Sequence, residues 1–225
     1  MTSRGTQCLK ILAVVALMIP VAAGAQPAGR LDTWATAPEG LFLSGEWQPY
    51  PGSSTRALKF PPAIVIDSGR RVLQIKTENE SVKIGRAVRI DVAQTPRLVW
   101  EWKAVTLPQG GDVRHPQRND QVARVVLLFE GLKAILYLWD TTAPAGVEVR
   151  SETLGEPVDR ALIVIRSGTV GLGQWRREVR NVAKDYTRLF GGTPGPVKWV
   201  GLESHSDDVH SQGEVLFGLI QFDAR

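Results

Sequence analysis

The stretch VARVVLLFEGLKAILYLW, residues 122–139, decides the fold class of this chain. Its two halves, 122–130 and 134–139, are dense in Val, Ile, Leu and aromatic residues, which favour β-strands. Gly131-Leu132-Lys133 joins the halves and is short enough for a hairpin loop. We therefore predict a β-hairpin whose strands are apolar on both faces.

The same kind of signal recurs along the rest of the chain. Each run is short, rich in Val, Ile, Leu or Trp, and bounded by Gly, Pro, Asn, Asp or Ser, as strands usually are. These runs predict further strands at 40–47, 72–77, 87–92, 98–106, 161–166, 197–202 and 214–222.

One helix is predicted over residues 182–190. Val182, Tyr186 and Leu189 share one face of it, and Gly191-Gly192 follows as a stop signal. A single helix among eight or nine short strands is not the alternation of strands and helices that builds a parallel sheet. We therefore predict a mainly β protein, an antiparallel β-sandwich with one short helix packed at an edge or across a sheet.

The first 25 residues have the pattern of a secretory signal peptide. Arg4 and Lys10 form the charged start, residues 11–21 are an apolar run, and Ala23-Gly24-Ala25 matches the cleavage pattern. The apolar run is shorter than the roughly 20 residues that span a bilayer, so an uncleaved membrane anchor is the less favoured alternative. We predict cleavage after Ala25.

Cleavage changes what the mature chain contains. Cys8 is the only cysteine, so the mature chain has no disulfide, no thiol nucleophile and no cysteine metal ligand. The formal charge of +4 loses the two basic residues of the signal peptide, and the remaining charges are interspersed, which gives no case for nucleic acid. We predict a flexible lead-in at 26–39 and a single domain at 40–225 without a transmembrane segment, periplasmic or secreted. The sequence indicates no oligomeric state.

Aromatic residues alternate on two of the predicted strands. Alternation places Trp100 and Trp102 on one face of their strand, and Tyr137 and Trp139 repeat the arrangement two strands later. Trp and Tyr are equally suited to core packing and to stacking on sugar rings. Both interpretations stay open: a tryptophan-anchored core, or a face that binds a saccharide or another flat ligand.

Arg124 interrupts the most apolar strand of the chain. A guanidinium stays charged in proteins and is costly to bury without a partner, so a carboxylate is expected nearby. We predict Asp120, two residues before the strand's first valine and on the same face, as that partner. The pair is then either structural or the floor of a site for an anionic ligand.

Polar and aromatic residues gather where a strand leads into the predicted helix: Trp175, Arg180, Asn181 and Asp185. Asn181 or Asp185 is suited to capping the helix, and Asp185 also suits the helix dipole. A ligand-binding role for the group is the alternative.

The segment 203–211 is the only one that holds histidine and acidic residues together. His205, Asp207, Asp208 and His210 are candidate metal ligands, of the types that zinc or another transition metal accepts. Segments of this composition are more often solvated loops. We predict no cofactor, with a metal ion at these residues as the alternative.

The order of these motifs resembles a known bacterial family. Trp100-x-Trp102, Asn119-Asp120-x-x-Ala123-Arg124, Tyr137-x-Trp139 and the segment from Arg180-Asn181 to Phe190-Gly191 together resemble the domain of unknown function 3047, over about residues 40–225. The resemblance implies export and a jelly-roll fold similar to carbohydrate-binding modules. Many members carry an Asp-x-Asp-Asn-Thr-like segment before the last strand, whereas this chain has residues 204–210 there.

Two main hypotheses of function follow. The first is a non-catalytic module that binds a saccharide or another cell-envelope polymer through its aromatic strands and polar residues. The second is a periplasmic hydrolase, metal-assisted or based on paired carboxylates, that uses the Asp/His cluster with Asp120. A structural or assembly factor is a third interpretation. Phosphate-binding, nucleophile-elbow and His-Glu-x-x-His motifs do not occur in the sequence.

Overall fold

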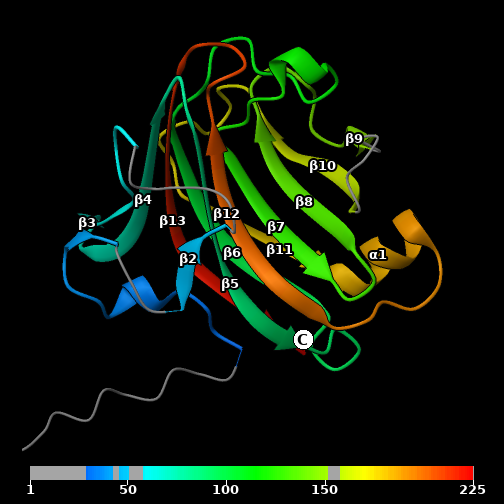
Figure 1. Ribbon diagram of the computed structural model, residues 1–225. Helices are drawn as coiled ribbons and strands as arrows, with labels where there is room; N and C mark the ends of the chain where they lie inside the picture. Colours follow the sequence, from blue (N-terminus) through cyan, green and yellow to red (C-terminus); the bar gives the residue numbers. More distant parts are fainter. Residues whose placement is uncertain (1–28, 43–45, 51–57, 152–157, 225) are drawn as a thin grey trace, which may run out of the picture.

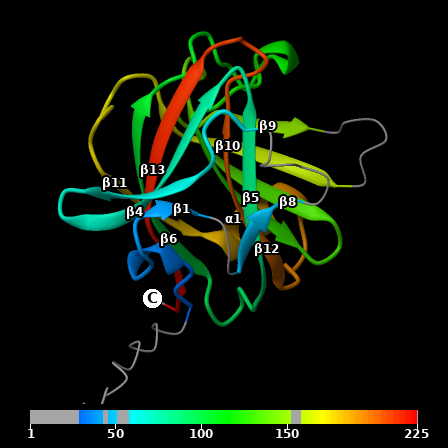
Figure 2. The same cartoon turned by 60° about the vertical axis from the view of Figure 1, so that its left-hand side comes forward.

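A computed structural model describes residues 29–42, 46–50, 58–151 and 158–224 of the chain. Two β-sheets face each other in it as the layers of a sandwich (Figures 1 and 2). The first sheet contains, in spatial order, β1 (Gly40–Leu41), β3 (Ala63–Asp67), β4 (Arg70–Glu78), β13 (Gln212–Asp223), β6 (Arg97–Thr106) and β11 (Arg176–Asn181). The second contains β2 (Trp47–Pro49), β5 (Ser81–Ile90), β12 (Val197–His205), β7 (Ala123–Phe129), β8 (Lys133–Asp140), β10 (Asp159–Ser167) and β9 (Glu148–Ser151).

The opening hairpin is confirmed as β7 and β8. The two strands pair antiparallel, with Val125 opposite Tyr137 and Leu127 opposite Ile135. Gly131 and Leu132 both have positive φ, which gives the turn the twist that hairpins favour. Consecutive strands β4 to β7 then alternate between the two sheets, so each crossing adds to both layers. The predicted mainly β, jelly-roll-like sandwich is confirmed.

One pair of strands departs from the antiparallel arrangement of the sandwich. β10 runs parallel to β8, with Ala161 opposite Ile135 and Ile163 opposite Tyr137. After β8 the chain first forms the edge strand β9, which reverses direction, and β10 then enters between the two. β3, β9 and β11 also have no counterpart among the predicted strands.

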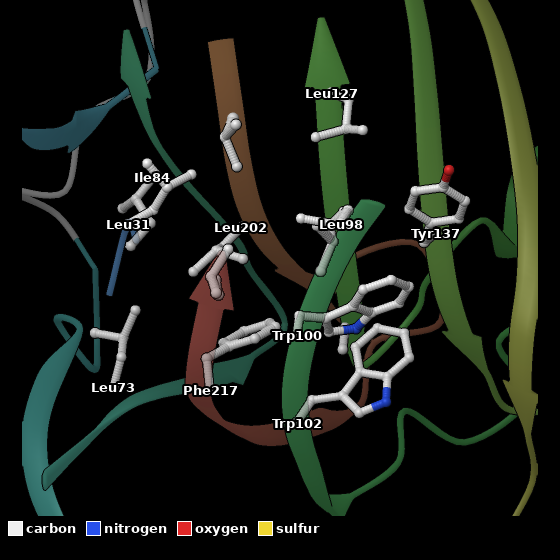
Figure 3. Packing of buried hydrophobic residues seen from close by; sticks show 14 of the residues in the cluster. Leu31, Leu73, Ile84, Leu98, Trp100, Trp102, Leu127, Tyr137, Leu202 and Phe217 are labelled. Carbon is white, nitrogen blue, oxygen red and sulfur yellow. The ribbon is translucent and has the colours of Figure 1, made fainter. Parts of the chain in front are cut away.

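The core lies between the sheets and is rich in aromatic residues. Trp100 stacks on Tyr137 with ring centroids 5.2 Å apart, and Trp102 meets Trp139 edge-on at 5.8 Å. Trp100 and Trp102 point from β6 toward the second sheet, where Tyr137 comes to meet them (Figure 3). All four side chains have no exposed surface. Their alternation on β6 and β8 therefore builds the core.

The prediction of a flexible lead-in is wrong for residues 29–39. Trp34, on the short 3₁₀ helix η1 (Thr33–Ala35), is fully buried and donates its indole N–H to the Gly218 carbonyl at 3.0 Å. Leu31 N–H bonds to the Ile220 carbonyl at 2.8 Å, and Phe222 N–H to the Gly29 carbonyl at 2.9 Å. The small and polar residues of this segment are typical of a flexible one, but burial of the single Trp34 side chain is enough to order it.

The predicted helix is confirmed as α1 (Val182–Phe190). Asn181 caps it by accepting the Lys184 N–H at 2.9 Å, and Gly191 closes its last turn. Tyr186 anchors the helix, with its ring 4.8 Å from that of Phe129. A second 3₁₀ turn, η2 (Pro116–Arg118), lies in the loop before β7.

The signal peptide and its cleavage point lie outside the described residues and stay predictions. Among the described residues, no helix has the length and hydropathy required to cross a bilayer.

Candidate functional site

The outward face of the second sheet carries the candidate site. Along β12, Val200 and Leu202 point into the core, so the alternate residues Trp199, Gly201 and Glu203 point outward. The same alternation on β7 directs Arg124 outward between the core residues Ala123 and Val125. Strand pairing therefore gathers charged and aromatic side chains over the middle of this sheet.

Arg124 and Glu203 form a buried ion pair on this face. The two residues stand directly opposite each other in the register of β7 and β12, and Arg124 Nη1 lies 3.3 Å from Glu203 Oε2. Arg124 also donates to Gln121 Oε1 at 2.8 Å and to the Asn119 carbonyl. Each side chain is only 7% exposed, so the pair has left water.

The predicted partner of Arg124, Asp120, is therefore wrong as a hydrogen-bonding partner. β7 begins only at Ala123, so the alternation that would place Asp120 beside Arg124 does not extend back to it. Asp120 instead accepts the Val209 N–H at 2.8 Å. The partner comes from a strand more than seventy residues later in the chain.

Glu203 also holds His205, which lies two residues further along β12. His205 Nε2 lies 3.0 Å from Glu203 Oε2. Burial acts to raise the pKa of Glu203, but the hydrogen bond with His205 and the charge of Arg124 outweigh it and hold the pKa at about 2. Burial and the charge of Arg124 lower the pKa of His205 to about 4. At neutral pH, Glu203 is thus ionised and His205 is neutral and donates to it.

Two aromatic rings lie on this face because two positions beneath them are glycine. A Cβ atom at Gly85 would overlap with the Trp199 indole, and one at Gly201 would overlap with the Tyr50 hydroxyl. The two rings meet edge-on, with centroids 5.7 Å apart. Burial, together with the charge of Glu203 and a hydrogen bond to it, raises the pKa of Tyr50 well above 10.

These residues line a groove of about 290 Å³ that runs across β12, β7, β8 and β10. One half of the lining is apolar, and its members are Val126, Leu128, Ala134, Leu136, Val158 and Leu162. The other half is polar or aromatic, and its members are Tyr50, Lys83, Asn119, Arg124, Arg160, Trp199 and Glu203. We call this the groove. Its described lining holds three cationic side chains and one carboxylate.

A wider hollow, of about 470 Å³, lies on the first sheet beside the N-terminal segment. Its lining includes Arg30, Asp32 and Arg70. Arg30 and Asp32 bind each other at 2.7 Å, and Arg70 binds Glu101 at 2.6 Å. The described lining of this hollow presents no aromatic ring, so the groove is the better candidate for a ligand.

The four aromatic candidates do not belong to the groove. Their side chains point into the space between the two sheets and are fully buried in the core: Trp100, Trp102, Tyr137 and Trp139. A ligand on the surface of the protein does not reach them. The structure therefore supports the interpretation of these residues as a tryptophan-anchored core and not as a binding face.

Arg180 and Asp185 form a second ion pair, at the start of α1. Arg180 Nη2 lies 2.5 Å from Asp185 Oδ1, and the Tyr137 hydroxyl donates to Asp185 Oδ2 at 2.9 Å. Arg188 binds the same carboxylate at 3.1 Å. The oxygens of Asp185 are thus occupied by groups that fix α1 to the core, and the arrangement is structural.

Trp175 lies on the outward face of the first sheet, apart from the groove. Its indole N–H donates to Asp67 Oδ2 at 2.6 Å, and the Arg70 guanidinium lies 4.0 Å from the ring centroid. The group predicted around residues 175–185 is therefore divided between two faces of the molecule.

The Asp/His segment divides as well. His205, Asp207 and Asp120 offer ligand atoms that all lie within 4.8 Å of one another. Asp208 is exposed and outside this trio, and His210 bonds through Nδ1 to Asn79 Oδ1 at 2.7 Å. The structure thus brings together two of the four predicted metal ligands and adds Asp120 to them.

Sequence reasoning missed Tyr50, Lys83, Trp199 and Glu203. A signal for two of them was present, because Trp199 and Gly201 alternate with Val200 and Leu202 in the predicted strand 197–202, and Glu203 continues this alternation one residue beyond it. That pattern indicates a strand with a functional outer face. Tyr50 and Lys83 carry no such local signal, since pairing of β2 and β5 with the rest of the sheet brings them to the groove.

The chain is similar to one protein family and to several solved structures. The family model described as Protein of unknown function (DUF3047) matches residues 57–221, which confirms the resemblance seen in the motifs. No curated protein matches the chain. Among solved structures, the family 12 xyloglucanase from Bacillus licheniformis is similar, with 9% identity, a TM-score of 0.48 and coverage of 84% of this chain and 97% of that one. The xyloglucanase domain of a type three effector from Sinorhizobium fredii, in complex with cellobiose, is similar at 9% identity and a TM-score of 0.46, with coverage of 73% and 88%.

Proposed function

This chain belongs to the DUF3047 family of proteins of unknown function, and we propose that it is a non-catalytic module that binds a cell-envelope saccharide in the groove. The observation that carries the proposal is the placement of Trp199 and Tyr50 on two glycines directly beside the Arg124–Glu203 pair. The predicted export would bring the protein to the periplasm or the cell exterior, where such polymers occur.

Aromatic rings and fixed polar groups are the two things that a sugar ring needs from a binding site. The half-buried Trp199 offers an apolar plate for the C–H face of a sugar. Arg124, Glu203 and the Asn119 side chain supply donors and acceptors beside it, already held in place by their own hydrogen bonds. Such preorganisation reduces the entropy lost on binding.

The charges of the groove favour an acidic saccharide over a neutral one. Lys83 and Arg124 contribute positive charge to the described lining, and Glu203 contributes the negative charge. Because Glu203 is already paired with Arg124, the charge of Lys83 is left to give the groove a positive field. A carboxylated sugar, such as a uronic acid, complements this field.

Binding explains this face better than glycoside hydrolysis does. The common hydrolytic mechanisms use two carboxyl groups on either side of the scissile bond, one of them protonated. The described lining supplies one carboxylate, and the hydrogen bond from His205 and the charge of Arg124 keep the pKa of Glu203 at about 2, which suits an ion-pair partner and not a proton donor.

The test is calorimetry on the protein purified after export. A uronic-acid oligosaccharide and a neutral glucan oligosaccharide of equal length serve as the two probes. We expect the acidic probe to bind more tightly, with an affinity that falls at high salt. Trp199→Ala should weaken this binding about tenfold, the loss of a ring contact worth roughly 1.4 kcal/mol.

Trp175→Ala is the matched control, because it removes a half-buried indole from the opposite sheet. Its affinity for the acidic probe should equal that of the unmodified protein. Absence of binding to either probe, or an equal loss in both variants, would overturn the groove as the binding site. Release of reducing ends from the probes during the experiment would overturn the non-catalytic part of the proposal and favour the hydrolase.

A further inference from the structure

Three potential ligand atoms converge beside the groove from different parts of the chain. Asp120 lies in the loop before β7, His205 ends β12, and Asp207 lies in the turn that follows. One ligand atom from each residue lies within 4.8 Å of the other two. None of these three side chains lines the groove itself.

The side chain of Asp120 indicates that a ligand binds here. Its side chain is fully buried, and while Oδ2 accepts the Val209 N–H, Oδ1 has no hydrogen-bond partner. A buried carboxylate oxygen without a partner is costly, and such groups are rare in folded proteins. A cation bound to Oδ1 supplies the missing partner.

His205 is already arranged as a metal ligand. Its Nε2 hydrogen-bonds to Glu203 at 3.0 Å, and Arg124 holds Glu203 from the other side. The hydrogen bond leaves Nδ1 as the ring nitrogen with a free lone pair. Metal-bound histidines usually donate their second N–H to a carboxylate in this way, because it fixes the ring and strengthens the ligand.

We propose that Asp120, His205 and Asp207 bind one divalent transition-metal ion, zinc or manganese. One imidazole and two carboxylates suit these ions, whereas calcium takes oxygen ligands alone. Tetrahedral ligands of zinc lie roughly 3.4 Å apart, closer than the 4.8 Å limit observed here. The exposed Asp207, held by Ser81 Oγ at 2.5 Å, is the ligand that moves inward to complete the site.

The site does not depend on the proposed saccharide, although Glu203 contributes to both. Glu203 lines the groove and orients His205, so a bound ion would lie next to a residue of the groove and would keep coordination positions that the three ligands do not fill. This arrangement matches three-ligand zinc sites, in which the remaining position is filled by water.

The experiment measures binding of the metal alone. The protein is purified after export without an affinity tag, stripped with a chelator and dialysed. Zinc and manganese are then titrated by calorimetry, and bound metal is counted by elemental analysis. We expect about one ion per chain and a rise in melting temperature, because an ion that binds only the folded state stabilises it.

Variants of neighbouring residues locate the ion. Asp207→Asn should weaken binding at least about tenfold, and Asp120→Asn should do so more strongly, while Glu203→Gln should weaken it roughly 10–100-fold through His205. Asp208→Asn and His210→Gln are the matched controls, an acid and a histidine of the same turn outside the trio. Each control should change the affinity less than about threefold.

Two results would overturn the proposal. The first is less than half an ion per chain at saturating zinc and manganese. The second is an affinity that falls as much in His210→Gln or Asp208→Asn as in Asp207→Asn. If Asp120→Asn does not fold, the exposed Asp207 still decides the outcome, because its substitution leaves the buried loop intact. Saccharide binding measured on the stripped protein separates failure of this site from failure of the groove.

Discussion

The two faces of β12 have different roles, although the residues on them are neighbours in the sequence. Val200 and Leu202 face the first sheet and are fully buried among the aromatic rings of the core. Glu203 and His205 occupy the alternate positions of the strand, so they point to the outer side, where they form hydrogen bonds and Glu203 carries charge. The comparison teaches that a single alternating strand supplies both the stability of the sandwich and the chemistry of its surface.

The two faces also differ in how their polar atoms are satisfied. In the core that the inner face of β12 adjoins, Trp102 of the first sheet donates its indole N–H at 3.1 Å to Glu178, which belongs to the same sheet as Trp102. On the outer face, Arg124 and Glu203 satisfy each other across two strands beside open space. Inner polar contacts thus lock the fold, while outer ones leave donors and acceptors at the edge of a groove.

The largest expected effect tests this comparison with two tryptophans. Trp102→Ala removes a fully buried indole and should lower the free energy of unfolding by about 3–5 kcal/mol. Trp199→Ala removes a half-buried indole from the outer face and should cost about 1 kcal/mol. Urea unfolding of both variants measures the difference. Equal losses would mean that the outer face is also part of the structural core.

A smaller effect is expected from adding one methyl group under the groove. In Gly201→Ala, the new Cβ overlaps with the Tyr50 hydroxyl and displaces that ring, at a cost of about 1–3 kcal/mol in stability. Affinity for the acidic oligosaccharide should fall more than in Gly195→Ala, whose Cβ meets only Glu130. Unfolding and calorimetry on both variants measure the two effects. Unchanged affinity in Gly201→Ala would remove Tyr50 from the groove's function.

The smallest effect compares two tyrosine hydroxyls, one on each side of the sheet. Tyr137→Phe removes the bond to Asp185 and should cost about 1 kcal/mol with unchanged saccharide binding. Tyr50→Phe should instead weaken saccharide binding, because its hydroxyl lies beside Glu203 in the groove. Unfolding and calorimetry at neutral pH separate the two. The opposite assignment would reverse the roles of the faces.

The same pair gives a pH dependence. Burial raises the pKa of both hydroxyls well above 10, so the folded protein keeps protons that the unfolded chain releases near pH 10. Stability should therefore fall as the pH rises above 10. Each Phe variant removes one group's share of that slope, which unfolding curves between pH 8 and 11 measure. A slope unaffected by both substitutions would contradict the buried state of these hydroxyls.

Local patterns predicted much of the sandwich. The hairpin around Gly131, the strands on either side of it and the helix capped by Asn181 all follow from hydrophobic spacing and turn residues. β11 was missed because four of its six residues are charged, and one of them, Glu178, points inward to bind Trp102. β9 was missed because it has four residues and sits at an edge.

The site was less predictable because it depends on pairs that are distant in sequence. The position of Arg124 in an apolar strand predicted a carboxylate partner. That partner, Glu203, is fixed by the register of β7 and β12, which no local pattern specifies. In the same way, Asp120 meets His205 and Asp207 only after β12 has paired with β7. Residue types indicated which chemistry was available, and strand order decided where it came together.

β13 occupies the centre of the first sheet. β13 pairs with β4 on one side and β6 on the other, so among the described strands it alone joins the two halves of the first sheet. Residues 29–31 also hydrogen-bond to it. The first sheet is thus closed by pairs that lie far apart in the sequence, and closure of this kind slows folding.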